Sequence, residues 1–339
     1  GADPGPACYG QGGDEPTVTD ADVLLGYLNP DYFLGGRMSL DRNASAAAVR
    51  TKLAEPLGMS VTDAAYGIYQ VVNENMISAT RVHVAERGAD PRKFKLIAFG
   101  GAGPVHAHQI ARALKMQGYI CPTSAGVASA LGFLTAPAAF EFARTHIARL
   151  DQDNLGELDA IYADLEREGH AKLAEAGVPT DEMQFTRKAD LRHIGQGHEI
   201  VVELPFAEMA ETALEDVHTL FYSAYEEIYG YAHRHLGLEI TTCRLTASGP
   251  RPDVNLRETE ADADQSSAAQ ALKGTRPVYF REHESFVDTP VYDRYALRAG
   301  AQFEGPAIVE EQDSTAVIGP DATVDVDAYA NLIVTLHYE

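Results

Sequence analysis

Residues 95–112 read KLIAFGGAGPVHAHQIAR. A short apolar run of strand length leads into the turn Gly100-Gly101-Ala102-Gly103, and a helix-like pattern resumes after Pro104, a residue tolerated at a first helical position. The periodic stretch before this segment, from residue 61, predicts a long helix, and YICP after it predicts another strand. This helix–strand–turn–helix–strand order is typical of α/β layer architectures.

The glycine turn lacks the spacing of the common phosphate-binding motifs. No Lys-Ser or Lys-Thr pair follows Gly103, as a P-loop requires, and the order GGAGP is not GxGxxG. Small residues at the end of a strand still let backbone N–H groups approach a ligand at a helix N-terminus. A ligand-facing turn and a tight packing corner are therefore both open from these residues alone.

Two histidines follow the turn within the predicted helix. His106 and His108 are two residues apart, so they point to different faces and do not chelate one metal ion together. We expect His106 to lie nearer a ligand at the helix start, although a packed or surface histidine is the commoner case. His193 and His198 flank a glycine turn that a hairpin explains better than a metal site.

Polar residues near the start of the chain form a second group of interest. Cys8 lies in a turn-rich segment that shows no base to activate it, so a structural or site-wall role is expected. The acidic residues that follow have oxygen ligands for a divalent ion, but solvated loop carboxylates and an N-cap role for Asp20 explain them more simply. These acidic residues are Asp14, Glu15, Asp20 and Asp22.

The composition excludes several classes of function. The 339 residues include 27 Lys and Arg against 50 Asp and Glu, a formal net charge of -23, and no basic block, so nucleic acid and anionic membranes are poor partners. The three cysteines are far apart and in no metal-binding spacing, which favours free thiols in the cytoplasm and no metal site. No apolar run reaches the ~18 residues of a spanning helix.

The rest of the chain continues the mixed pattern. We expect a strand at 139–150, a helix at 153–177, two strands around Gly195 and Gly197, a helix at 207–230 and a strand at 238–247. Caps are expected at Thr19-Asp20 for a first helix, and at Thr62 or Asp63 and Gly88 for the long one. The predicted organisation is a 1–60 segment, a 61–150 α/β core, a 151–250 α+β region, a 251–275 linker or mobile loop and a 276–339 β-rich module.

Several long motifs together resemble the A-subunit family of ATP-dependent hydantoinases and 5-oxoprolinases, which includes homologous subunits of acetone and acetophenone carboxylases. The resemblance covers nearly the whole chain. The motifs that carry it are GADPGPACYG, GGDEPTVTDADVLLGYLNPDYFLGGRMSLD, YGIYQVVNENM, ADPRKFKLIAFGGAGPVHAHQIAR, AGVASALGFL, DLRHIGQGHEI, AYEEIYGY, TPVYDRYAL and EGPAIVEEQDSTAVI.

The resemblance implies a fold and a cofactor. The fold is α/β, the second lobe of a sugar kinase, actin and heat-shock chaperone-like (ribonuclease H-like) structure, incomplete, followed by the β-rich C-terminal module. Two DxGGT phosphate-binding motifs of the family are absent here, so the chain resembles a C-terminal portion, and its start at Gly1 suggests a fragment or a split half. ATP and Mg²⁺ would be bound mostly by the upstream half.

The resemblance also implies roles for particular residues. The glycine turn would face the adenosine end of the nucleotide, with His106 close by. The catalytic residues stay unknown, with Asp20, Asp22 and His106 as candidates, and no general base is identifiable. The nucleotide-binding residues are Gly100, Gly101, Ala102, Gly103 and His106, and the residues expected at a cleft are Asp3, Cys8 and Tyr9.

The implied activity is ring opening of hydantoin, N-methylhydantoin or 5-oxoproline through a phosphorylated intermediate. Its partners would be a B-type hydantoinase subunit and the N-terminal half of the A-subunit, and this portion alone would be inactive. Two alternatives remain open: a subunit of an ATP-dependent ketone carboxylase, and a non-catalytic assembly half.

Overall fold

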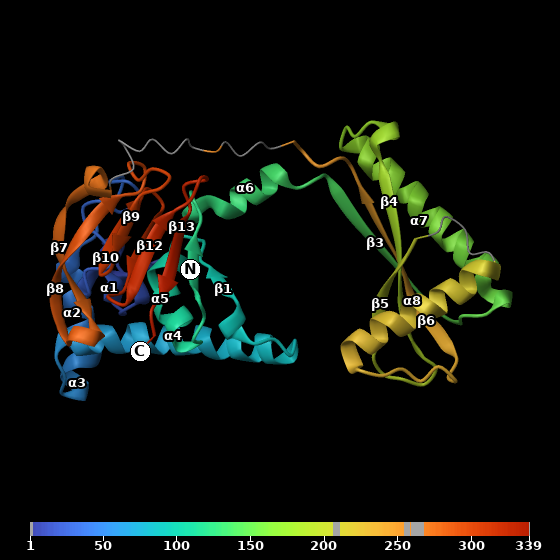
Figure 1. The fold of residues 1–339 in the computed structure, drawn as a ribbon, viewed down its shortest axis with the longest axis horizontal. Helices are drawn as coiled ribbons and strands as arrows, with labels where there is room; N and C mark the ends of the chain where they lie inside the picture. Colours follow the sequence, from blue (N-terminus) through green and yellow to red (C-terminus); the bar gives the residue numbers. More distant parts are fainter. Residues whose placement is uncertain (1–2, 206–210, 254–257, 259–267, 339) are drawn as a thin grey trace. The chain divides into compact units, whose positions relative to one another are not determined.

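The chain divides into two units because residues 133–254 pack among themselves, whereas the segments before and after them pack together. The computed structural model describes residues 3–205, 211–253, 258 and 268–338 (Figure 1). Unit 1 is formed by 1–132 and 255–339, and unit 2 by 133–254. No helix in the described part of the chain is long and apolar enough to cross a membrane.

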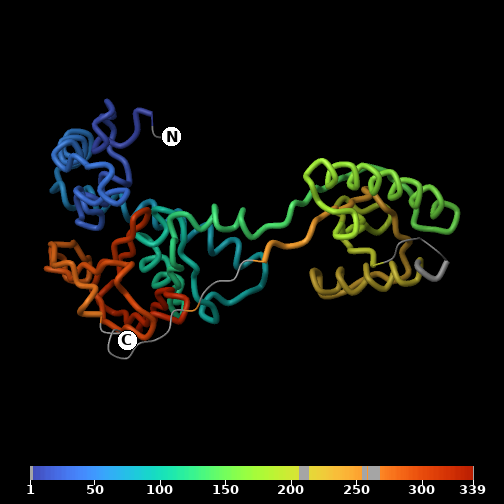
Figure 2. Tube along the Cα trace, turned by 90° about the horizontal axis from the view of Figure 1, so that it is seen from above, coloured from blue at the N-terminus to red at the C-terminus, as the bar shows by residue number. Residues whose placement is uncertain are grey.

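A five-stranded sheet in unit 1 joins the two ends of the sequence. Its order is β1 (Lys95–Ile97), β2 (Gly118–Cys121), β13 (Leu332–Leu336), β12 (Ala322–Val326) and β9 (Gln302–Glu304). The first two strands are parallel and the others antiparallel, with Val334 opposite Tyr119. Figure 2 shows the red C-terminal trace beside the teal segment that carries β2.

A second sheet in unit 1 is built from the C-terminal segment alone. Its order is β11 (Ser314–Ile318), β10 (Ala307–Glu311), β8 (Ser285–Asp293) and β7 (Leu272–Phe280). Every residue of β10 and β11 is buried, since both faces of these strands are covered. The sequences AIVEE and STAVI are therefore fully buried strands, with β10 inside the sheet and β11 at its edge.

Helices complete unit 1. They are α1 (Val18–Leu24), α2 (Arg42–Val49), α3 (Glu55–Leu57), α4 (Val61–Glu86) and α5 (Gly103–Ala113), with a π turn at Arg50–Ala54. Helix α6 (Ala128–Thr135) begins in unit 1 and ends three residues past its boundary at 132. Tight turns of 3-10 helix lie at Ala7–Tyr9, Pro91–Lys93, Ala125–Val127, Ala268–Ala271 and Arg281–His283.

Two helix starts differ from the sequence-based expectation. Thr17, not Thr19, caps α1, and it forms a reciprocal capping box with Asp20. Ser60, rather than Thr62 or Asp63, caps α4 by accepting from the Asp63 amide. Each cap lies two or three residues earlier than predicted, because a hydroxyl bonds the N–H three residues ahead.

Unit 2 is an antiparallel sheet with two long helices. The strand order is β3 (Ala139–Arg149), β6 (Leu238–Ser248), β4 (Gln184–His193) and β5 (Ile200–Leu204). The helices are α7 (Leu155–Glu175) and α8 (Glu211–Tyr229), with 3-10 turns at Gln152–Asn154 and Thr180–Glu182. One hydrophobic cluster contains side chains from both helices and from the sheet, so the elements share one core.

The mixed α/β fold and the β-rich C-terminal segment are confirmed, but the domain boundaries differ. The strand at 139–149 pairs with β6, so it belongs to unit 2 and not to a 61–150 core. The expected 251–275 linker is too long, because Ala268 and Ala271 are buried and β7 begins at Leu272. The module at 276–339 does not stand apart, since β13 pairs with β2. Residues 254–257 and 259–267 of that linker, and 207–210 of the predicted helix, lie outside the described residues.

Candidate functional site

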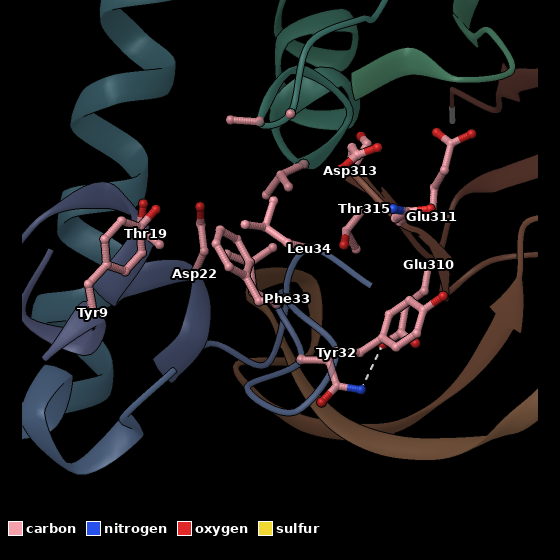
Figure 3. Close-up of a pocket in the computed structure, with 17 residues that line it drawn as sticks. Tyr9, Thr19, Asp22, Tyr32, Phe33, Leu34, Glu310, Glu311, Asp313 and Thr315 are labelled. Carbon is pink, nitrogen blue, oxygen red and sulfur yellow. Dashed lines mark hydrogen bonds between the residues drawn. The ribbon is translucent and has the colours of Figure 1, made fainter. Parts of the chain in front are cut away.

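A cavity of about 260 Å³ lies in unit 1, where the glycine turn meets two other loops. Figure 3 shows Phe33 and Leu34 between one end formed by Tyr9, Thr19 and Asp22 and another formed by acidic and hydroxyl side chains. The walls come from four segments of the chain. Its lining residues are Tyr9, Thr19, Asp22, Leu28, Asn29, Tyr32, Phe33, Leu34, Gly101, Ala102, Val105 and the six residues 310–315.

The glycine turn is both a packing corner and a cavity wall. Gly100 has φ +90°, and its amide donates to the Ala125 carbonyl at 2.7 Å. A Cβ on Gly101 would lie 3.4 Å from the Asp313 carbonyl oxygen, which is an ordinary van der Waals contact. The α5 helix then begins at Gly103 without a side-chain cap. Gly101 and Ala102 line the cavity. Gly100 is not among the lining residues, and its hydrogen bond to Ala125 stabilises the turn.

A buried ion cluster holds the loop at residues 28–34 against β10. Glu310 is 1% exposed, forms ion pairs with Lys273 and Arg276, and accepts from the Asn29 amide at 3.0 Å. Burial alone would raise the pKa of Glu310, but bonding to Lys273 and the charge of Arg276 outweigh it and hold that pKa below its usual value. The Lys273 ammonium also lies 3.6 Å from the ring centroid of Tyr32. These contacts fix two cavity-lining residues, Asn29 and Tyr32.

The turn after β10 forms the opposite rim. Glu311 accepts from the backbone amides of Ser124 at 2.7 Å and Ala125 at 3.2 Å, and burial raises its pKa. Asp313 pairs with Arg37 at 3.1 Å. The carboxylates at this rim therefore already have partners within the chain.

Asp22 differs from the other carboxyl groups of the cavity. It is 3% exposed, its Oδ1 has no hydrogen-bond partner, and its Oδ2 lies 4.0 Å from His106 Nε2. Burial raises the pKa of Asp22 well above its usual value. Burial likewise lowers the pKa of His106 to about 4, so this imidazole is uncharged at neutral pH, and the same burial favours the protonated form of Asp22.

His106 lies behind the cavity wall and does not line it. Its Nδ1 is 3.1 Å from Asn73 Oδ1, and its ring stacks on Tyr69 with centroids 5.0 Å apart. His108 faces the other side of α5, where its Nδ1 accepts from the Gly319 amide at 3.2 Å and its Nε2 lies 3.0 Å from Asp321. The two histidines therefore point to different faces, as their spacing predicted.

Asp20 organises the N-terminal loop. Its carboxylate accepts the amides of Ala7 and Cys8 at 3.1 and 2.8 Å and the hydroxyls of Thr17 and Ser45 at 2.8 and 2.7 Å. Burial opposes its ionisation, but the hydrogen bonds from Ser45 and Thr17 outweigh burial and lower the pKa of Asp20. All of these bonds are within the chain. They hold the N-terminal loop in place immediately before Tyr9.

The three residues expected at a cleft have separate surroundings. Tyr9 lines the cavity. Cys8 is 1% exposed, and burial together with the charge of Asp20 raises the pKa of its thiol to about 12, so it is not a nucleophile at neutral pH. Asp3 is exposed and is not among the lining residues. Within the described residues, no three His, Cys, Asp or Glu side chains gather where they could hold a metal ion.

Sequence reasoning did not assign site residues to two of the walls. The loop at 28–34 carries turn-forming residues between apolar ones, and the acidic and hydroxyl run EEQDST at 310–315 interrupts two buried strands. A polar run between buried strands is the signal that could have indicated the second wall. These two walls lie near residue 101 because strands far apart in the sequence pair with one another. The periodicity of apolar residues does not predict such long-range pairing.

Comparisons with known proteins extend these observations. A family model described as hydantoinase/oxoprolinase matches residues 1–141, and one described as hydantoinase/oxoprolinase C-terminal domain matches 148–338. The chain is 34% identical to the caprolactamase subunit alpha of Pseudomonas jessenii, over 99% of this chain and 48% of that protein. It is 32% identical to the acetophenone carboxylase gamma subunit of Aromatoleum aromaticum, over 97% of this chain and 46% of that protein.

Solved structures show the same relationship in three dimensions. The chain is similar to acetone carboxylase in a nucleotide-free structure, with a TM-score of 0.79, 25% identity and coverage of 98% of this chain and 48% of that one. It is also similar to the ATP-dependent caprolactamase from Pseudomonas jessenii, with a TM-score of 0.75, 32% identity and coverage of 100% and 49%. The chain spans about half the length of these relatives.

Proposed function

The chain belongs to the hydantoinase/oxoprolinase family, and we propose on that premise that it is the C-terminal part of an ATP-dependent subunit that opens cyclic amides. The cavity beside the glycine turn would bind the adenosine end of ATP. Gly101 and Ala102 would contact the nucleotide directly, while Gly100, Gly103 and His106 would shape the wall behind them.

One observation carries the nucleotide assignment: among the described residues, none of those that line the cavity is Lys, Arg or His. A triphosphate requires cations or a row of free amides, whereas a nucleoside requires apolar walls with a few hydrogen-bonding groups. Leu28, Phe33 and Val105 provide such walls, and hydroxyl and amide groups lie around them. This lining supports binding of the uncharged end of the nucleotide in the cavity.

The charges of the lining residues also argue against placing Mg²⁺ and the phosphates in this cavity. Glu310, Glu311 and Asp313 are engaged by cations or backbone amides, and burial raises the pKa of Asp22, which disfavours its charged form. The phosphates and Mg²⁺ would then be held by residues of the upstream half. Bound ATP would supply a phosphoryl group that turns a carbonyl oxygen into a better leaving group. This chain would orient the nucleoside and keep water from it.

Similarity to acetophenone and acetone carboxylases supports a second reaction, ATP-dependent carboxylation of a ketone. Both reactions activate a carbonyl oxygen, so the cavity suits either. Bicarbonate dependence of ATP consumption distinguishes them. In either case the working protein would include the N-terminal half and a B-type partner subunit. A purely structural half, which docks the partner without binding nucleotide, is the outcome if the complete complex binds no ATP.

The experiment is an ATPase and product assay on the complete subunit with its partner. We expect ATP consumption that depends on a hydantoin, a lactam or 5-oxoproline. Gly101→Val should raise the Kd for ATP about tenfold or more, because its side chain fills the cavity beside Asp313. Gly67→Val is the matched control, since a Cβ at Gly67 meets nothing within 4 Å. No ATP consumption with any cyclic amide or ketone refutes the proposal, and an unchanged Kd in Gly101→Val refutes the role of the turn.

A further inference from the structure

One polar atom at the cavity is buried and has no partner. Asp22 Oδ1 makes no hydrogen bond, although the side chain is only 3% exposed and lines the cavity. Buried polar groups in folded proteins are almost always bonded, and an exception needs an explanation. A ligand that completes the bond explains it.

The groups around Asp22 favour the protonated form of its carboxyl group. His106 approaches from α5 at 4.0 Å, and Tyr69 from α4 and Tyr27 after α1 are close enough that the charge of Asp22 would raise their pKa values. All three neighbours are uncharged at neutral pH, and no Lys or Arg within the described residues pairs with Asp22. Burial with no cation nearby favours the protonated form of a carboxyl group.

A protonated carboxyl group is a hydrogen-bond donor, unlike the other carboxylates at the cavity. The complementary ligand atom is an acceptor in an uncharged, flat, largely apolar group. Purine ring nitrogens are such acceptors. In Figure 3 the Asp22 side chain stands beside the Phe33 ring, at the end away from Glu310 and Glu311.

We propose that Asp22, as an undissociated carboxylic acid, donates a hydrogen bond to a ring nitrogen of the purine base bound in this cavity. The inference rests on the proposed nucleotide site and deepens it. Asp22 is therefore a recognition residue for the base, and it takes no part in transfer of the phosphoryl group.

The test measures Kd values for ATP and for its 1-deaza, 3-deaza and 7-deaza analogues, in which a C–H replaces one ring nitrogen. The protein is the complete subunit with its partner. One analogue should bind about 5- to 100-fold more weakly than ATP, because the acid proton loses its acceptor. Asp22→Asn keeps an N–H donor and should retain this discrimination, whereas Asp22→Leu should remove it. Asp31→Asn is the matched control, because Asp31 is exposed on the neighbouring loop and does not line the cavity.

The outcomes separate this inference from the proposed function. Discrimination that persists unchanged in Asp22→Leu overturns the role of Asp22 but leaves the nucleotide site intact. Absence of ATP binding to the wild-type complex overturns both. If Asp22→Leu does not fold, the wild-type series decides, since ATP and all three analogues binding within twofold of one another overturns the inference.

Discussion

Gly126 packs directly on the backbone of Asp313: a Cβ at Gly126 would lie 2.2 Å from the Asp313 carbonyl oxygen. This contact joins the 3-10 turn at Ala125–Val127, which also anchors Gly100, to the acidic rim of the cavity. The position of the rim therefore depends on the absence of one methyl group.

Gly126→Ala should displace the turn at residue 313 and lower the free energy of unfolding by about 1–3 kcal/mol, the usual cost of overpacking. Chemical unfolding and ATP affinity would both report it. Gly156→Ala, in a helix where a Cβ meets nothing within 4 Å, should be neutral or slightly stabilising. Equal stability of the two variants would contradict this prediction, because it would show that the turn at residue 313 accommodates the added methyl group at no cost.

The buried histidines make the protein sensitive to acid. Burial lowers the pKa of both His106 and His108 from 6.5 to about 4. The unfolded chain therefore binds more protons below pH 6.5, and stability falls as the pH drops from about 6.5 toward 4. At pH 5 each histidine should lower the free energy of unfolding by about 2 kcal/mol relative to pH 8.

Unfolding curves at pH 5 and pH 8 measure this loss. His108→Gln, which removes one titrating group, should be less sensitive to pH than the wild type. His283→Gln, on an exposed turn, should match the wild type. A pH dependence of His108→Gln equal to that of the wild type would contradict the assignment.

Asp20 should be a positioning residue. Asp20→Asn exchanges one acceptor oxygen for a donor and leaves buried amides at residues 7 and 8 poorly paired, which should lower the free energy of unfolding by about 3 kcal/mol. Asp14→Asn, at an exposed carboxylate, should change it by less than about 0.5 kcal/mol. Full stability with complete loss of activity in Asp20→Asn would instead indicate a catalytic group.

The buried ion pairs of Glu310 should contribute more to the free energy of unfolding than ion pairs at the surface. Glu310→Gln leaves Lys273 and Arg276 without their buried counter-ion, and breaking such a cluster costs about 3–5 kcal/mol. Thermal unfolding should show the loss. The exposed pair at Glu226, removed by Glu226→Gln, should have an effect near zero. Similar melting temperatures for the two variants would contradict this ranking.

Local sequence signals predicted the elements well where periodicity and turn residues agree. The strand, glycine turn and helix at 95–113, the helix at 61–86 and the strand pair around Gly195 follow from apolar spacing and glycine positions. The observed N-caps of α1 and α4 differ from the predicted ones, because several neighbouring Ser, Thr and Asp residues could each cap the same helix start. Tyr9, Asp22 and residues 101–102 of the site were named from the sequence, and all line one cavity.

The remaining walls were not predictable from local patterns. Asn29 meets Glu310 across 281 residues of sequence, and Gly100 meets Ser314 across 214. Such contacts depend on the order of strands in the sheets and on a buried ion cluster. Neither feature can be predicted from the spacing of apolar residues in the sequence. The raised pKa of Asp22 also arises only from its burial.

The pairing of β2 with β13 also sets an order of folding during synthesis. Val334, which pairs with Tyr119, leaves the ribosome about 200 residues later, a delay of about 10–40 s at ordinary rates of translation. Unit 2 is contiguous and has its own core, so it can fold during that interval. The half-built sheet of unit 1 meanwhile exposes an unpaired edge, which is where chaperones and premature aggregation would compete for the nascent chain.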